Sequence, residues 1–437
     1  MNRFIQLSIT LLMLNSTLVS AAATAINYGY PLDNRYAATI LGTPIEFKAE
    51  LPKFNNIPHK EYHLKMPDAR TMPDVFWYHG RGLDYAVTAQ KTKAPLIFAI
   101  AGTGAGHSSA KMKLFQRAFY QAGYHVITIS SPTFTNFMVN ASKTAIPGNL
   151  QQDSADLYQV MQLIMAEQSD LEVSNYNLIG YSLGASQAAF VSRIDEQEQV
   201  FNFNKVLMIN PPLNLIHSVN ILDKMLVSNI PGGVDNFNEF FKGFMRKVTD
   251  FHRVHRKLSI TGPDFFYKAY QTTVSNDSKM QAIIGLAFRM SASDMIFVSD
   301  VFNNLGYLVP ENTELSSSSS LTRYSKASRR LGFSDYIEEI YLPYFSQTTG
   351  NSRDELIAQS SLLSIKDYLQ QSDKIGLMHN EDDPILLQGE IDSIKSLFPG
   401  RAMIYPYGGH CGNMEYKDNV NYMVNFFTGG ELSGSNQ

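Results

Sequence analysis

The sequence predicts an α/β protein with a mostly parallel, doubly wound sheet and a large helical insertion. Apolar runs that suit strands buried on both faces alternate with helical patterns in two parts of the chain, 95–212 and 372–428. Such repetition implies right-handed crossovers and a sheet covered on both faces. Residues 213–371 lack the alternation and read as mostly helical. With 437 residues, the chain is long enough to bury a core.

The first part of the expected core contains four strands and three helices. Residues 95–100 form a continuous apolar run that ends at Ala101-Gly102, which is typical of a buried strand. The helix expected next ends at Gly123, a common helix stop. The expected strands are 95–100, 125–129, 176–180 and 205–210, and the expected helices are 109–122, 150–167 and 184–193.

The rest of the chain divides into an N-terminal segment, the insertion, the second part of the core and a tail. Residues 26–94 are less regular and supply candidate edge strands, and residues 429–437 form the tail. In the insertion we expect helices at 236–257, 265–274, 279–289, 334–341 and 353–369. In the second part we expect strands at 374–379 and 402–405 and helices at 386–397 and 416–427.

Composition and charge exclude several classes of partner and cofactor. The 36 Lys and Arg against 40 Asp and Glu leave a net charge of −4, with no long basic run, so we expect no nucleic-acid partner. The single cysteine, Cys411, excludes an internal disulfide and thiolate-rich metal sites. His252 and His255 lack a third ligand. We therefore expect no metal and no cofactor.

The first 25 residues have the layout of a secretory signal peptide. A positive start at Arg3 precedes the apolar stretch 4–14, and small residues follow, so the mature chain is expected to begin after Ala21, Ala23 or Ala25. A buried N-terminal helix is the alternative. No later run reaches about 18 uncharged apolar residues, so no transmembrane segment is expected. The expected location is periplasmic or secreted.

The sequence Gly180-Tyr181-Ser182-Leu183-Gly184 lies between an expected strand and an expected helix. A serine at such a sharp turn needs small neighbours two residues away on each side, and glycine is the smallest. The motif by itself is not specific, because Ser182 could equally stand in an ordinary tight turn. Its context in the chain therefore decides how it is interpreted.

An acid and a histidine follow this serine in the order that nucleophilic catalysis needs. A serine hydroxyl needs a histidine to take its proton, and the histidine needs a carboxylate to orient it. Asp383 follows an expected buried strand, with Asp382 as the competing acid, and His410 follows the last expected strand between glycines. As structural alternatives, Asp383 suits a helix start before Pro384 and His410 suits a loop.

On these residues the chain resembles a serine hydrolase of the α/β-hydrolase fold, esterase-like or lipase-like, over about 95–212 and 374–428. The resemblance implies Ser182 as the nucleophile, His410 as the general base and Asp383 as the orienting acid. Some members carry the acid one strand earlier, but residues 210–214 contain no carboxylate here. The resemblance also implies an oxyanion hole made by the Leu183 amide and by that of Thr103, with Gly104 as the alternative to Thr103.

The expected function is hydrolysis of a small-molecule or lipid-like carboxylic ester through an acyl-enzyme. Amide, thioester or lactone cleavage and acyl transfer use the same residues, and a non-catalytic binding protein would share the fold. Residues 102–106 follow the Gly-x-Gly-x-Gly pattern, which makes a nucleotide-binding loop a weaker alternative, since no Lys-Ser/Thr follows. His107 is expected in a loop near the site. Cys411 is expected to be a small neighbour of His410.

Overall fold

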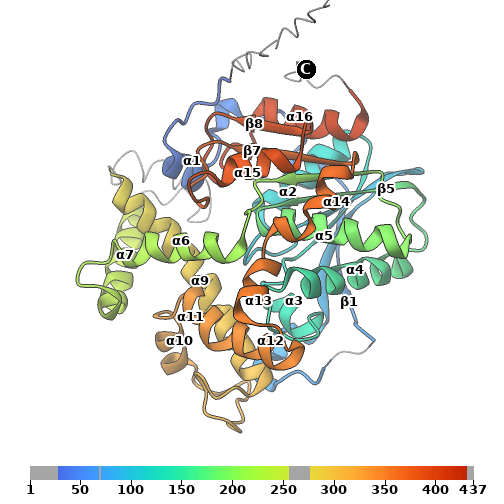
Figure 1. Cartoon of the computed structure of the whole chain (residues 1–437). Coiled ribbons are helices and arrows are strands. Elements are labelled where there is room, and N and C mark those ends of the chain that lie inside the picture. The colour runs from blue at the N-terminus through green and yellow to red at the C-terminus, as the bar shows by residue number, and fades with distance from the viewer. Residues whose placement is uncertain (1–27, 68–69, 255–275, 431–437) are drawn as a thin grey trace, which may run out of the picture.

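The computed structural model describes residues 28–67, 70–254 and 276–430. Its strands form one eight-stranded sheet in the order β1-β2-β4-β3-β5-β6-β7-β8 (Figure 1). β2 is antiparallel to β1 and β4, and the other neighbours are parallel. The predicted fold class is therefore confirmed. The strands are β1 (His59–Leu64), β2 (Leu83–Thr88), β3 (Ala94–Ile100), β4 (His125–Ile129), β5 (Val173–Tyr181), β6 (Lys205–Ile209), β7 (Ile375–Asn380) and β8 (Ala402–Tyr405).

Both faces of the sheet are buried at its central strands, because alternate residues of these strands enter two different cores. In β3, Phe98 packs with one core and Ile97 with the other. Helices α4 (Leu150–Glu167), α5 (Leu183–Glu198), α14 (Lys366–Gln371) and α15 (Glu390–Leu397) cover the first face, and α2 (Ala110–Gln121) and α16 (Lys417–Thr428) cover the second. This is the doubly wound arrangement that the apolar strands predict.

The N-terminal segment supplies an edge of the sheet and a helix that reaches the site. β1 and β2 lie together at one end of the sheet order. Asn34 caps α1 (Arg35–Leu41) by accepting hydrogen bonds from the amides of Tyr36 and Ala37. The remaining short elements of the N-terminal half are η1 (Ile45–Phe47), η2 (Phe54–Asn56), η3 (Asp74–His79) and α3 (Thr135–Asn140). The expected signal peptide and residues 431–437 of the tail lie outside the described residues.

The insertion between β6 and β7 gathers beyond one end of the sheet, where we call it the cap (Figure 1). We call the two segments where the chain enters and leaves the cap its neck. They are joined by a hydrogen bond that the Leu362 amide donates to the Leu213 carbonyl at 2.9 Å. The cap elements are α6 (Leu215–Val227), η4 (Val234–Asn236), α7 (Phe237–Val254), α9 (Asp277–Asn303), α10 (Thr322–Ser328), α11 (Phe333–Tyr336), η5 (Ile337–Tyr341), α12 (Leu342–Thr349), α13 (Arg353–Gln359) and η6 (Leu362–Ile365).

Several helices of the cap differ from the expectation, and α10 and α12 lie where no helix was expected. The helix expected at 279–289 continues as α9 to Asn303. The helix expected at 353–369 is interrupted, because Ser361 forms a β-bridge with Asn214 at the neck. α6 was not expected. The helix expected at 265–274 lies outside the described residues.

α9 is the long apolar helix of the cap. By length and composition it could cross a membrane, yet 61% of its most apolar window is buried within the protein. Its Arg289 is buried and pairs with Asp223 of α6 at 3.2 Å. A packed helix with a buried ion pair is the arrangement of a core helix. The absence of a transmembrane segment remains a prediction.

Candidate active site

Ser182 occupies a sharp turn between β5 and α5, as the sequence pattern predicts. Its φ is +54°, a strained backbone angle for a residue with a side chain. The turn is possible only because its neighbours are small. A Cβ on Gly180 would lie 2.1 Å from the Gly184 carbonyl oxygen, and one on Gly184 would lie 2.4 Å from the Ile100 carbonyl oxygen. The two glycines therefore let helix, turn and adjacent strand approach closely.

Three side chains from distant parts of the chain form one continuous hydrogen-bonded series. The Ser182 hydroxyl lies 2.9 Å from Nε2 of His410, and Nδ1 of His410 lies 2.9 Å from Oδ2 of Asp383. All three residues are buried, with exposed fractions of 7%, 6% and 4% for Ser182, His410 and Asp383. This places the imidazole where it can accept the hydroxyl proton while the carboxylate accepts the proton on Nδ1.

The loop that carries His410 is held by residues that sequence reasoning missed. The His410 amide donates to Oγ1 of Thr39 in α1 at 2.9 Å. Asn380 donates from Nδ2 to the Gly409 carbonyl at 2.7 Å and exchanges further hydrogen bonds with Asn413. No local pattern in the sequence marks Thr39, since its partner is far along the chain. These contacts fix the direction in which the imidazole points.

Asp383 is surrounded by donors that favour its charged form. Asn210 donates from Nδ2 to Oδ2 at 2.9 Å, and the Ile385 amide donates to Oδ1 at 3.1 Å. The buried His379 accepts the Asn380 amide at Nδ1 and donates from Nε2 to the Pro211 carbonyl. Burial lowers the pKa of His379, which disfavours a positive charge on this second histidine.

Asp382, the competing acid, faces the histidine loop rather than the imidazole. Its Oδ1 accepts the Gly409 amide at 2.9 Å, and Oδ2 has no hydrogen-bond partner among the described residues. Burial raises the pKa of Asp382 above its usual 3.8. The geometry therefore assigns the contact with His410 to Asp383.

Burial and pairing act in opposite directions on the two titratable groups of this series. Burial alone would lower the pKa of His410, but the Asp383 carboxylate, with the nearby Cys411, outweighs it and raises the value to about 10. Burial alone would raise the pKa of Asp383, but His410 outweighs it and lowers the value below 3.8. The pair therefore favours an imidazolium beside a carboxylate, the charge state that forms when a serine proton is transferred.

Two backbone amides beside Ser182 have no partner among the described residues. Leu183 begins α5, so its N–H lies in the first helical turn, where amides have no intrahelical acceptor. The Gly104 amide is already used, since it donates to Oγ1 of Thr133 at 2.8 Å. No acceptor is found for the amide of Thr103 in the described part of the chain. Of the two expected donors in that loop, Thr103 is the one that remains free for an oxyanion.

The fold is decided by a mostly parallel sheet of this strand order, with a strained serine turn after β5 and with Asp383 and His410 after β7 and β8. The chain has the α/β-hydrolase fold. In this hydrolase fold the three side chains lie at the carboxyl ends of the strands, where open α/β sheets bind ligands.

No protein-family model matches the chain, and no curated protein matches it. Solved structures similar to this hydrolase fold include a fungal esterase from Rhizomucor miehei, with 11% identity over 92% of this chain and 98% of the esterase and a TM-score of 0.44. A bacterial membrane phospholipase A is 12% identical over 86% of this chain and 87% of the phospholipase, with a TM-score of 0.40. The thioesterase domain of the curacin biosynthetic pathway is 11% identical over 85% of this chain and 99% of the thioesterase domain, with a TM-score of 0.39.

The glycine-rich loop 102–106 is covered by the cap. A Cβ on Gly104 would lie 2.2 Å from Oγ of Ser291, which is in α9. The loop therefore has no open face at Gly104 for a phosphate group, which argues against the nucleotide alternative.

His107 is buried near Glu61 of β1, at 3.7 Å, and makes no hydrogen bond to the three side chains of the site. Cys411 Sγ lies 3.9 Å from Nε2 of His410.

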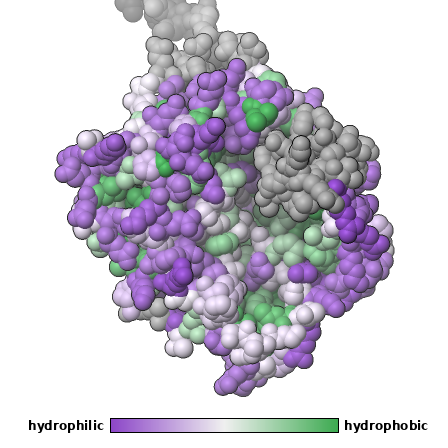
Figure 2. Space-filling model, turned by 180° about the vertical axis from the view of Figure 1, so that it is seen from behind, coloured by the Kyte–Doolittle hydropathy of each residue, from purple (hydrophilic) through white to green (hydrophobic). Residues whose placement is uncertain are grey.

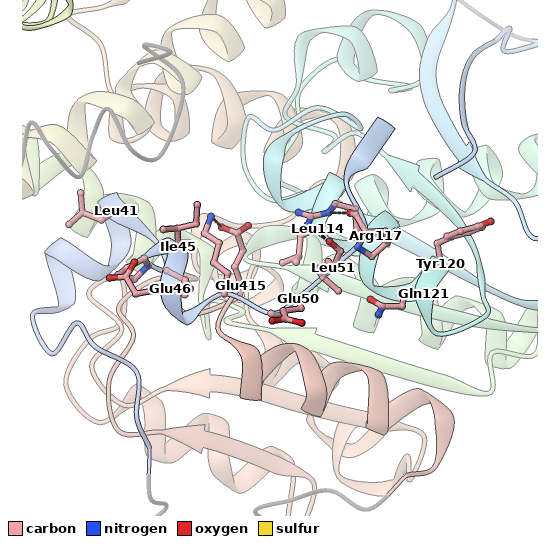
Figure 3. A pocket seen from close by; sticks show the side chains of 15 residues that line it. Leu41, Ile45, Glu46, Glu50, Leu51, Leu114, Arg117, Tyr120, Gln121 and Glu415 are labelled. Atoms are coloured by element: carbon pink, nitrogen blue, oxygen red, sulfur yellow. Dashed lines mark hydrogen bonds and ion pairs between the residues drawn. The ribbon is translucent and has the colours of Figure 1, made fainter. Parts of the chain in front are cut away.

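Two cavities differ sharply in their relation to the site. The larger, about 990 Å³, lies along the N-terminal segment and α2 and includes none of the three side chains (Figure 3). Its walls are tied by the Lys48–Glu415 ion pair at 2.6 Å and by Arg117, which donates to the Leu51 and Pro52 carbonyls. A smaller cavity of about 30 Å³ touches Thr103 and Leu183 and lies between sheet and cap.

The face of the molecule opposite to the view of Figure 1 is mostly hydrophilic. Figure 2 shows charged and polar residues over most of one face, with hydrophobic residues gathered toward its recessed middle. Among the described residues, no group of three or more His, Cys, Asp or Glu is arranged to hold a metal ion.

Proposed function

We propose that the protein is a serine hydrolase that cleaves a carboxylic ester through an acyl-enzyme intermediate. The observation that carries this proposal is the series from Ser182 Oγ to His410 Nε2 and from His410 Nδ1 to Asp383 Oδ2, with 2.9 Å at each step. A hydroxyl, a base and an orienting acid at these distances can activate a nucleophile.

In the first half-reaction, the Ser182 hydroxyl gives its proton to Nε2 of His410 as Oγ bonds to the ester carbonyl carbon. The amides of Leu183 and Thr103 donate to the resulting oxyanion, and each such donor contributes about 2.7–4 kcal/mol in comparable sites. His410 then gives its proton to the leaving alkoxide. In the second half-reaction, water loses a proton to His410 and attacks the acyl carbon, which releases the acid and restores Ser182.

An ester is the first choice because the cap packs at one end of the sheet and bounds a small apolar cavity beside the proposed oxyanion donors. Amide, thioester and lactone cleavage would use the same atoms. Acyl transfer would differ only in excluding water. A non-catalytic binding protein is the contrasting possibility, since fold alone does not establish activity.

Labelling with a fluorophosphonate tests the proposal. We expect the reagent to modify Ser182 and to inactivate the protein, with the label found on the peptide that contains this residue. Ser182→Ala should lose the label, whereas Ser396→Ala, which changes an exposed serine of α15, should keep it. Absence of labelling in correctly folded protein would support the binding protein instead.

A further inference from the structure

The small cavity lies directly beside the proposed oxyanion donors. Thr103 and Leu183 both line it, and the rest of its wall comes from the loops after β4 and from the cap. An ester whose carbonyl oxygen is held by these two amides has its acyl chain close to them as well. The cavity is therefore in the position to receive the acyl chain of the substrate. This inference rests on the proposed function.

The wall of the cavity offers apolar surface and no charge. Its apolar side chains are Leu183, Leu215, Ile216, Val219, Met295, Phe333 and Ile337, together with Pro147. Most of the polar groups are committed to the protein itself, and an exception is the buried Tyr341 hydroxyl, which has no hydrogen-bond partner among the described residues. Tyr336 donates to the Pro147 carbonyl at 2.7 Å, Ser360 donates to the Leu356 carbonyl at 2.9 Å, and Thr133 accepts the Gly104 amide. Such a wall favours an uncharged hydrocarbon chain.

The volume of the small cavity limits the length of the hydrocarbon chain that it can hold. About 30 Å³ is open to the centre of a water-sized sphere, and one water needs roughly 10–15 Å³ by the same measure. The space therefore holds about two or three non-hydrogen atoms. The walls at Met295 and Ile337 are themselves buried, with exposed fractions of 2% and 7%. A longer chain would have to push apart close-packed side chains, which is unfavourable.

We propose that this cavity is the acyl pocket and that it restricts the enzyme to short acyl groups, from acetyl to butyryl. Beyond the carbonyl carbon, these groups add one to three carbons and fill the space without displacing the cap. Met295 of α9, Val219 of α6 and Ile337 of η5 set the limit, because they form its cap side.

The test is hydrolysis of p-nitrophenyl acetate, butyrate, hexanoate and octanoate by the full chain. We expect kcat/KM to be highest for acetate or butyrate and to fall at least about tenfold by octanoate, because overpacking grows with each methylene. An octanoate optimum would overturn the pocket but leave the hydrolase proposal intact. Failure to hydrolyse any of the four esters, together with absence of fluorophosphonate labelling, would instead overturn the proposed function.

A pair of matched variants tests which residues limit the length of the acyl chain. Met295→Ala removes side-chain volume from the cavity wall and should move the optimum toward hexanoate. Met290→Ala makes the same change in the same helix but at a residue that lines a different cavity, so it should leave the chain-length profile unchanged. A shift caused by Met290→Ala alone would place the acyl chain elsewhere and overturn the assignment.

If Met295→Ala, which enlarges the cavity, does not fold, a second variant that fills the cavity still tests the proposal. Val219→Phe adds volume to the cap side of the cavity and should reduce kcat/KM for butyrate about tenfold more than for acetate, in protein whose circular dichroism matches the wild type. An equal loss on both esters, or none, would contradict the pocket.

Discussion

Asn210 donates a hydrogen bond from Nδ2 to Oδ2 of Asp383 at 2.9 Å, and this is the same carboxylate oxygen that lies 2.9 Å from Nδ1 of His410. Asn210 directly follows β6 and has a φ of +47°. An amide therefore stands where some members of the fold carry the acid, and it contacts the acid that follows the next strand. We infer that Asn210 orients Asp383 and helps to keep it ionised.

Removal of this amide should slow the reaction without changing substrate binding. Because Asn210 has a left-handed backbone, Asn210→Gly removes the donor and still permits the turn. The loss of a hydrogen bond to a charged group, about 1.5–3 kcal/mol, predicts a fall in kcat of about 10- to 100-fold with little change in KM. Steady-state kinetics on a short ester measures both. An unchanged kcat would show that Asp383 is held by its other contacts.

The two neighbouring aspartates should differ greatly in their effect on turnover. Asp383→Ala removes the partner of Nδ1 of His410 and should cut kcat by about 10⁴-fold. Asp382→Ala removes only an acceptor for the Gly409 amide and should cost about tenfold at most. Kinetics of the two variants side by side is the measurement. A larger fall in kcat for Asp382→Ala than for Asp383→Ala would make Asp382 the catalytic acid.

The pH dependence of kcat/KM should report the raised pKa of His410. Only the neutral imidazole can take the Ser182 proton, so activity is lost as pH falls below that pKa. Because Asp383 and Cys411 raise it to about 10, the acid limb should lie above 6.5, the usual histidine value. Cys411→Ala should move the limb to lower pH. A wild-type limb at or below 6.5 would contradict the assignment.

The serine turn should tolerate no side chain at Gly180. An added Cβ would lie 2.1 Å from the Gly184 carbonyl oxygen, so Gly180→Ala should destabilise the fold by at least about 3 kcal/mol and abolish activity. The control is Gly243→Ala in α7, where a Cβ would meet no atom within 4 Å. That change should raise stability by up to about 1 kcal/mol through helix propensity. Thermal unfolding of both variants compares them, and equal behaviour would contradict the close approach.

The first 25 residues should direct export of the protein and then be removed. Cell fractionation and N-terminal sequencing of the full chain, expressed in a bacterial host, should find a mature form that begins after Ala21, Ala23 or Ala25 in the periplasm or medium. A Leu12→Arg variant, which breaks the apolar stretch, should stay unprocessed inside the cell. Unprocessed wild-type protein would contradict this prediction.

The strands and the serine turn could be predicted closely because their signals are local. β4, β8 and α4 begin and end at the expected residues, since each is a short buried run or an amphipathic stretch bounded by residues that stop it. The cap was predicted less well. α9 continues beyond the expected helix because residues such as Ser293, polar by sequence, are buried against partners in the cap.

The sequence by itself determined the fold class, the turn at Ser182 and the order in which the serine, acid and histidine occur. These properties depend on residues that are neighbours in the chain. Only the tertiary structure placed Asp383 rather than Asp382 against His410, tied the Gly104 amide to Thr133, and placed Thr39 and Asn210 around the site. These outcomes depend on hydrogen bonds and close packing between distant segments, and the packing of the whole chain sets those distances.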